Sequence, residues 1–247
     1  MDLVRDISDV LVADPRVRCN VTHALLLQMI NQLATIQAQA GDISMADLIV
    51  LAGNVALNEA GEVNLDFCPG RGDAADGSKS QDLEPRNYIV DPIQNARDNI
   101  KVMGLSDYEY VALAARPRSA AYMKGLGYTG SWSTNPSILD NTYFDVLLNL
   151  DYLPVGSSQQ PHLGRGLVKP PTILEEYKAT DANVYMTGFD MAIRYNPILR
   201  AIAQNYLSNN DMFMHHFKEG WTKLMNADRF DGPYGNLCHD PNNIITL

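Results

Sequence analysis

Residues 44–61, SMADLIVLAGNVALNEAG, decide the fold class of this chain. Ser44 is a typical side-chain cap, and apolar residues then occur nearly all the way round the predicted helix. Ala52 and Gly53 permit another backbone to approach closely, so we expect this helix to lie at the centre of a helical domain. Gly61 is predicted to end it.

Apolar residues at three- and four-residue spacing predict further helices along the chain. The predicted ranges are 26–41, 91–104, 106–115, 141–150, 198–206 and 213–224. Pro117 stops the helical pattern, since proline lacks an amide hydrogen, and we predict a loop from there to Pro136. Residues 67–88 also read as a loop, and 152–178 as an irregular stretch that could include a small hairpin. Strand-like alternation is almost absent, so the fold class is mainly α with long connections.

The composition indicates a globular protein that does not bind nucleic acid. The chain has 247 residues, 46% of them hydrophobic, and a net charge of -10. That charge repels nucleic acid and anionic lipid, and no apolar run reaches the ~18 residues of a membrane helix, so we expect no membrane insertion. Cys19, Cys68 and Cys238 fit no metal spacing and are expected as thiols. The localisation stays open, because cytosol, mitochondrial matrix and plastid all suit the chain.

Four segments, in order, resemble class I haem peroxidases, the group of catalase-peroxidases and ascorbate peroxidases. Residues 43–61 with FCPGR at 67–71 resemble the central helix and the loop after it. Residues 127–149 resemble the stretch that carries the tryptophan beneath the haem, and 187–211 the segment with the aspartate that orients the haem-ligating histidine. FKEGWTKLMNADRFD at 217–231 resembles the end of the haem-free C-terminal half of catalase-peroxidases, the part to which the chain looks closest.

The resemblance implies the helical haem-peroxidase fold with long loops. It covers roughly residues 20–232, so we expect an irregular segment at 1–20, a peroxidase-like domain at 21–232 and a tail at 233–247. The first helices, which carry the distal histidine and arginine in active relatives, are expected to be missing or degenerate. No Arg-x-x-Trp-His pattern occurs in the sequence.

The residues that would bind haem are replaced. Trp132 and Asp190 match the proximal tryptophan and aspartate of the family, but Pro117, or Arg116 with the gap placed differently, stands where the iron-ligating histidine should be. Neither residue can coordinate iron. We therefore expect no catalytic residue, no cofactor-binding residue and no haem.

A cation-binding loop of ascorbate peroxidases has a partial counterpart in Ser133, Asn135, Ile138 and Asp140. The remaining hydroxyl ligand of the family corresponds to Arg118, whose guanidinium could pair with a carboxylate and take the place of the ion. The favoured interpretation is an internal Arg118–Asp140 bridge, with a bound ion, or neither, as alternatives.

The RGD tripeptide and the histidines are interpreted without a functional role. The RGD tripeptide at 71–73 is read as chance within a Gly-Asp-rich loop. His216 shares an apolar helix face and is expected to be packed and hydrogen-bonded, whereas His23, His162, His215 and His239 are interpreted as surface residues.

The favoured function is a non-catalytic, haem-free peroxidase-like protein that acts as a structural subunit among other protein subunits. One alternative is an active haem peroxidase that reduces hydrogen peroxide, with its missing parts supplied elsewhere. Another is a binding module that uses the vacated haem pocket for a different ligand.

Overall fold

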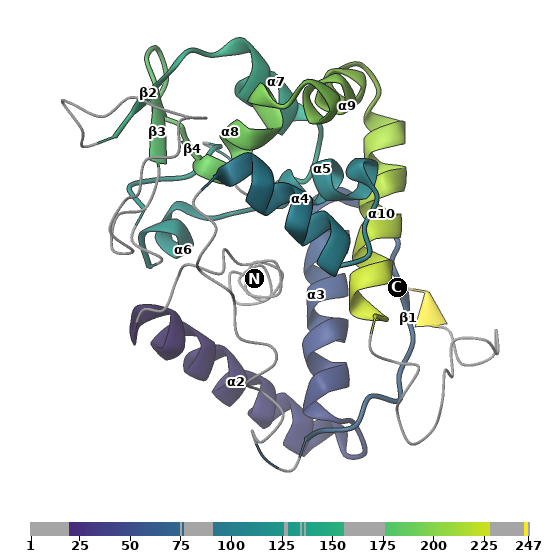
Figure 1. Cartoon of the computed structure of the whole chain (residues 1–247). Helices are drawn as coiled ribbons and strands as arrows, with labels where there is room; N and C mark the ends of the chain where they lie inside the picture. Colours follow the sequence, from purple (N-terminus) through teal and green to yellow (C-terminus); the bar gives the residue numbers. More distant parts are fainter. Residues whose placement is uncertain are drawn as a thin grey trace. The chain divides into compact units, whose positions relative to one another are not determined.

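The computed structural model describes residues 20–74, 76, 91–125, 128–133, 135, 137–155, 176–227 and 245–246. It divides into two compact units, Met1–Pro85 with Thr222–Leu247, and Arg86–Trp221. Most of the described chain is helical (Figure 1), which confirms the mainly α class. The segment expected at 1–20 and most of the expected tail lie outside the described residues, so the predicted boundaries of those two parts stay predictions.

The first unit contains the helix pair α2 (Asn20–Ala40) and α3 (Met45–Gly61). Gly41, with a φ of +83°, follows α2, and the Ser44 hydroxyl accepts a hydrogen bond from Asp47 N at 3.0 Å, as predicted for a cap. The left-handed residue that terminates α3 is Glu62, one position after the predicted stop. A small core joins the two helices, and its buried members are Met29, Leu33, Leu48 and Ala52.

A short two-stranded sheet follows α3. Strand β1 (Asp66–Phe67) pairs antiparallel with β5 (Ile245–Thr246). Cys68, next to β1, is held in a disulfide bond whose partner lies outside the described residues, so the expectation of a thiol is wrong at this position. Within the described part of the chain, no helix taken alone is long and apolar enough to cross a bilayer; residues 28–40 and α3 reach that threshold only as a pair bent by 105°.

The second unit is built from a series of helices, which are capped largely as the sequence predicts. Asp91 caps the first of them through Ile93 N and Gln94 N, and Ser106 forms a reciprocal capping box with Glu109. The predicted loop 117–136 is wrong in one part, because a short helix occupies 120–125. In chain order the helices are α4 (Pro92–Val102), α5 (Asp107–Ala114), α6 (Ala120–Gly125), α7 (Thr142–Asn149), α8 (Gly188–Tyr195), α9 (Pro197–Ser208) and α10 (Asn210–Met225). The last four residues of α10, Thr222–Met225, belong to the first unit.

Three antiparallel strands stand beside α8 in the same unit (Figure 1). They are β2 (Tyr152–Pro154), β3 (Glu176–Ala179) and β4 (Tyr185–Thr187), in the order β2-β3-β4. Strands β2 and β3 form the small hairpin expected between 152 and 178, and β4 adds a strand that the sequence pattern did not predict. Since β4 ends at the residue that caps α8, the sheet fixes where α8 begins.

An aromatic core holds the helices of this unit together. Phe144 of α7 lies 5.2 Å from Tyr206 of α9 and 5.3 Å from Phe213 of α10, measured between ring centroids. These rings are fully buried, and each contributes about 1.5–3 kcal/mol to the free energy of folding. The predicted apolar stripe of α10 is confirmed at Phe213, Phe217, Gly220 and Trp221.

Candidate functional site

A buried ion pair joins two segments of the second unit that are 72 residues apart in sequence. Arg118 Nη1 donates to Asp190 Oδ2 at 3.2 Å, and Arg118 Nη2 donates to Asp190 Oδ1 at 2.9 Å. The two side chains are only 5% and 3% exposed. The guanidinium therefore binds the carboxylate through two parallel hydrogen bonds, the strongest geometry available to this pair of groups.

The first turn of α8 positions Asp190. Thr187 is the N-cap of α8, and its amide and hydroxyl donate to Asp190 Oδ2 at 2.7 and 2.8 Å. The Asp190 amide donates back to the Thr187 hydroxyl at 3.4 Å, which completes a capping box. Thr187 was not predicted as part of the site, although the T-x-x-D spacing at 187–190 was visible in the sequence.

The non-helical segment after α5 positions Arg118. Its carbonyl accepts a hydrogen bond from the Ser131 hydroxyl, and the Trp132 indole donates to the neighbouring Arg116 carbonyl at 3.4 Å. Arg116 turns back toward α5, where Nη1 donates to the Leu113 carbonyl at 3.5 Å. The segment that carries Arg118 is thus tied to both α5 and the loop around Trp132.

Tyr143 of α7 is the third member of the cluster. Its hydroxyl donates to Asp190 Oδ1 at 2.6 Å, and its ring packs edge-on against Trp132 with 5.2 Å between ring centroids. With two hydrogen bonds from Arg118 and two from Thr187, Asp190 accepts five in all. A carboxylate has about four lone-pair directions, so its accepting capacity is filled. No spacing rule in the sequence could have identified Tyr143.

The electrostatics of the cluster hold each group in one protonation state. Burial alone would raise the pKa of Asp190, but the Arg118 charge and the hydrogen bonds from Arg118, Tyr143 and Thr187 together lower it below its ordinary value. Burial, followed by the Asp190 charge, raises the pKa of Tyr143 well above its ordinary value. General acid–base catalysis needs a group that titrates near the working pH, and neither residue does so.

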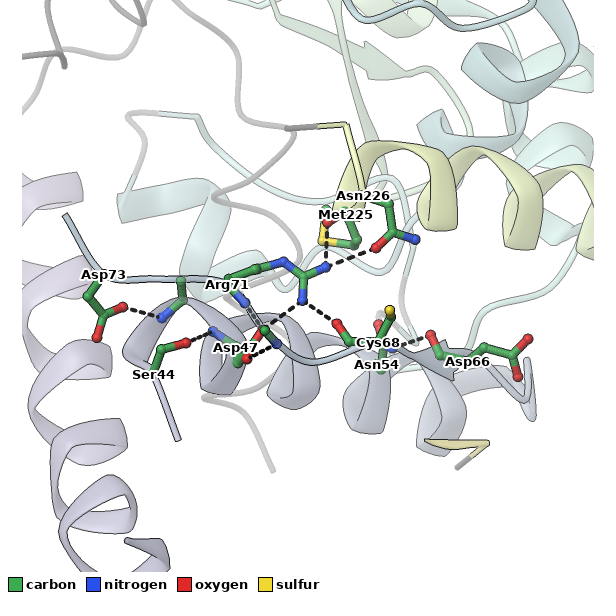
Figure 2. A network of polar contacts seen from close by, with 11 residues as sticks. Ser44, Asp47, Asn54, Asp66, Cys68, Arg71, Asp73, Met225 and Asn226 are labelled. Carbon is green, nitrogen blue, oxygen red and sulfur yellow. Dashed lines mark hydrogen bonds and ion pairs between the residues drawn. The ribbon is translucent and has the colours of Figure 1, made fainter. Parts of the chain in front are cut away.

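A separate polar cluster lies in the first unit, shown in Figure 2. Arg71 Nη1 donates to Asp47 Oδ1 at 2.9 Å and to the Cys68 carbonyl at 2.8 Å, while Nη2 donates to the Met225 carbonyl at 2.6 Å and to Asn226 Oδ1 at 3.1 Å. Asp47 also accepts hydrogen bonds from the amides of Gly70 and Arg71.

Both charged side chains of the RGD tripeptide at 71–73 form hydrogen bonds within the first unit. The Arg71 side chain is 10% exposed, and Asp73 accepts hydrogen bonds from the first amides of α3, Met45 N at 2.8 Å and Ala46 N at 2.9 Å. Both side chains are therefore bound to other residues of their own unit (Figure 2), so each has a structural role there.

A comparison with known protein families identifies the family of this chain. The model of the peroxidase family matches residues 20–209, about three quarters of the chain. The chain belongs to the peroxidase family.

The relatives of this peroxidase-family chain are longer proteins. It is 31% identical over 229 residues to a catalase-peroxidase from Halorhodospira halophila, a match that covers 83% of this chain and 30% of the relative. A catalase-peroxidase from Synechocystis is 31% identical over 232 residues, with 85% and 29% covered. The chain thus spans about 30% of the length of these catalase-peroxidases, and the kinship supports membership of the class I haem peroxidase superfamily.

Among the residues that follow α5, the structure shows which one binds Asp190. The family resemblance left Pro117 and Arg116 as alternatives for the position of the haem-ligating histidine. Pro117 is buried without a polar side chain, and Arg116 bonds to α5, whereas Arg118 reaches Asp190. Trp132 and Asp190 are brought together as predicted, both next to Tyr143.

The predicted Arg118–Asp140 bridge is wrong, because both terminal nitrogens of Arg118 bind Asp190. Asp140 instead accepts hydrogen bonds from the amide and hydroxyl of Thr142, at 2.9 and 2.5 Å, at the start of α7. Asp190 is the more deeply buried carboxylate, and an unpaired charge at such a position carries the larger penalty. Of the other residues expected to correspond to a cation-binding loop, Ser133 Oγ accepts a hydrogen bond from Asn135 N, and Ile138 is 43% exposed.

Proposed function

We propose that this peroxidase-family chain binds no haem and serves as a structural subunit that acts through contact with other proteins. The observation that carries the proposal is the bidentate ion pair of Arg118 with Asp190. In the family that the sequence resembles, this aspartate orients the imidazole that ligates iron. In this chain the Arg118 guanidinium binds the aspartate in place of an imidazole. A guanidinium stays protonated and offers no lone pair to a metal.

The saturation of Asp190 supports the same proposal. A histidine that ligates a metal donates its other nitrogen to a carboxylate or carbonyl partner. Asp190 already accepts two hydrogen bonds from Arg118, one from Tyr143 and two from Thr187, so it has no capacity for an imidazole donor. A haem-binding state would have to break the buried ion pair, which stabilises the fold as it stands.

Burial around the ion pair argues against a large open pocket at this point. Trp132 is 2% exposed, and Tyr122 and Met123 of α6 are 4% and 5% exposed. Protein interiors pack at nearly crystalline density, so side chains in contact with one another leave no room for a porphyrin. This favours a filled interior over the alternative of a binding module with a different ligand.

The part of the proposal that concerns protein contact rests on the relatives. In catalase-peroxidases the matching stretch is about 30% of a longer polypeptide. A peroxidase-type unit can therefore be one part of a larger protein. Its surface can keep a role in contacts with other proteins after the unit has lost its catalytic activity. Purification under native conditions is expected to yield the chain in a complex of fixed stoichiometry, and a lone monomer would contradict the structural role.

Titration with haemin tests the haem-free part directly. The sequence has two tryptophans, so a Trp221→Phe variant leaves Trp132, which packs against Tyr143 beside the ion pair, as the only tryptophan. We expect no sharp Soret band and no saturable quenching of Trp132 fluorescence at one haem per chain. A catalase-peroxidase stripped of haem and reconstituted in parallel provides the positive control. Stoichiometric haem with a sharp Soret band, or peroxide turnover by the loaded chain, would overturn the proposal in favour of an active peroxidase.

A further inference from the structure

Two histidines and a glutamate form a cluster on the part of α10 that belongs to the second unit. His215, His216 and Glu219 each offer a ligand atom, and these atoms lie within 4.8 Å of one another. His215 Nε2 is 3.4 Å from Glu219 Oε1. His215 is a surface residue, as interpreted from the sequence, and it also has a neighbouring carboxylate, because Glu219 lies one helical turn further along the same helix.

The hydrogen bonds behind His216 fix its tautomer. The Tyr206 hydroxyl donates to the Tyr108 carbonyl at 2.9 Å, and a carbonyl can only accept. The single hydroxyl proton is therefore used there, so at the 2.8 Å contact between Tyr206 Oη and His216 Nδ1 the imidazole must be the donor. Neutral His216 then carries its proton on Nδ1 and keeps the Nε2 lone pair for a ligand.

Tyr206 and Tyr108 also hold the His216 ring in place. The His216 ring centroid is 5.0 Å from that of Tyr108 and 5.7 Å from that of Tyr206. Tyr206 is fully buried, so the partner that orients the imidazole is itself rigid. Metal-ligating histidines typically donate their second nitrogen to such a partner, which fixes the ring and raises its basicity.

We propose that His215, His216 and Glu219 form a site for Zn²⁺. Two imidazoles and one carboxylate are a ligand set that zinc uses with a fourth position open to water or another donor. Hard ions such as Mg²⁺ prefer oxygen ligands and do not suit this set. The His215 and Glu219 side chains are 66% and 50% exposed, so they can rotate to bring all three ligand atoms to bonding distance. The site is independent of whether the chain binds haem.

The test uses the full chain without a histidine tag and Zn²⁺ alone in isothermal titration calorimetry. We expect one Zn²⁺ per chain, with affinity weakened at least tenfold in His215→Ala and in Glu219→Gln. Glu59→Gln provides the matched control, because Glu59 is exposed on α3 and belongs to no metal-ligating group among the described residues. It should leave the affinity unchanged.

A second variant tests the tautomer argument. Tyr206→Phe removes the acceptor of the His216 proton while keeping the buried ring, and loss of such a partner typically weakens metal affinity by about 10–100-fold. Circular dichroism and thermal melts of the metal-free variants establish that each is folded. Absence of stoichiometric Zn²⁺ binding at 100 µM by the wild-type chain, or binding that His215→Ala and Glu219→Gln leave unchanged, would overturn the assignment. An unchanged Zn²⁺ affinity in Tyr206→Phe would show that Tyr206 does not position His216 for the metal.

Discussion

Arg118 and Asp190 share two hydrogen bonds in the interior of the second unit, between a non-helical segment and the first turn of α8. A buried ion pair of this kind makes its two members dependent on each other. Moving either charge out of water is costly, and the pair is tolerated because each side chain neutralises and hydrogen-bonds the other. Removal of one partner therefore has a much larger effect than the modest net value of the pair.

Replacement of Arg118 by leucine should destabilise the chain severely. It leaves the Asp190 carboxylate buried beside an apolar side chain, and the expected loss in the free energy of unfolding is about 3–5 kcal/mol. Equilibrium denaturation with urea measures it. Arg97→Leu is the matched control, since the Arg97–Asp107 pair is 3.5 Å long and its side chains are 37% and 27% exposed. An exposed pair of that kind is worth about 0–1 kcal/mol, so equal losses in both variants would refute the prediction.

The pH dependence of that loss carries a definite sign. In the wild-type chain the pKa of Asp190 is lowered, so the pair stabilises the fold above the unfolded-state pKa, about 3.9, and this contribution is lost as the pH falls through the folded-state value. In Arg118→Leu burial dominates and should raise the pKa of Asp190, so protonation relieves the unpaired charge.

The difference in unfolding free energy between wild type and Arg118→Leu should therefore be largest near neutral pH. It should shrink as the pH falls, first through the raised pKa of Asp190 in the variant and then, as wild type loses the ion pair, below the unfolded-state pKa of about 3.9. Denaturation curves at pH 7, 5 and 3.5 measure this difference. As a control, Arg118→Leu combined with Asp190→Asn should show a much flatter difference from wild type over the upper part of this range. A difference that grows on acidification would contradict the assigned role of Asp190.

The sequence predicted most helix positions because local signals determine them. Ser44 and Ser106 cap the helices predicted after them, and the α10 stripe is buried as its spacing indicates. The short helix α6 was missed, since six residues give too little periodicity, although the Ser119 hydroxyl does accept a hydrogen bond from Tyr122 N. Local signals can locate an element only when it is long enough to show its period.

The partner of Arg118 depended on tertiary structure and could not be predicted. Asp140 and Asp190 were both available in the sequence, at separations of 22 and 72 residues, and a one-dimensional pattern does not rank them. The choice depends on which carboxylate is desolvated, and that follows from how α7, α8 and the loop around Trp132 pack. The family resemblance located Trp132 and Asp190, yet it contained no information on Tyr143.

Substitution in the buried cluster around Arg71 should lower the free energy of unfolding. Asp47→Asn removes the charge that pairs with Arg71 and weakens an acceptor of two backbone amides. Hydrogen bonds to a charged group are worth about 1.5–3 kcal/mol, so we expect a loss of about 2–3 kcal/mol in unfolding free energy. Asp42→Asn, an exposed aspartate of the same unit, should change it by less than about 0.5 kcal/mol. Similar effects at both positions would show that the Asp47–Arg71 pair contributes little.

Replacement of Gly130 by a residue with a side chain should destabilise the fold for a steric reason. A Cβ at this position would lie 2.5 Å from Cδ2 and 2.7 Å from Cε2 of the Tyr185 ring. The backbone there cannot easily retreat, because Gly130 N and Thr129 N donate to the buried Glu176 carboxylate and Tyr185 N donates to the Ser131 carbonyl. We expect Gly130→Ala to cost about 1–3 kcal/mol, as overpacked sites do.

Thermal and urea denaturation of the wild-type chain and four variants separates this clash from a general effect of alanine. Gly72→Ala should be neutral or slightly stabilising, because nothing lies within 4 Å of the place that its added methyl group would take and alanine restricts the unfolded chain. In a Tyr185→Ala background the ring is gone, so the further cost of Gly130→Ala should fall to below about 0.5 kcal/mol. If that cost stays the same without the ring, the clash with Tyr185 is not its origin, and the constraint must come from the backbone that Glu176 holds in place.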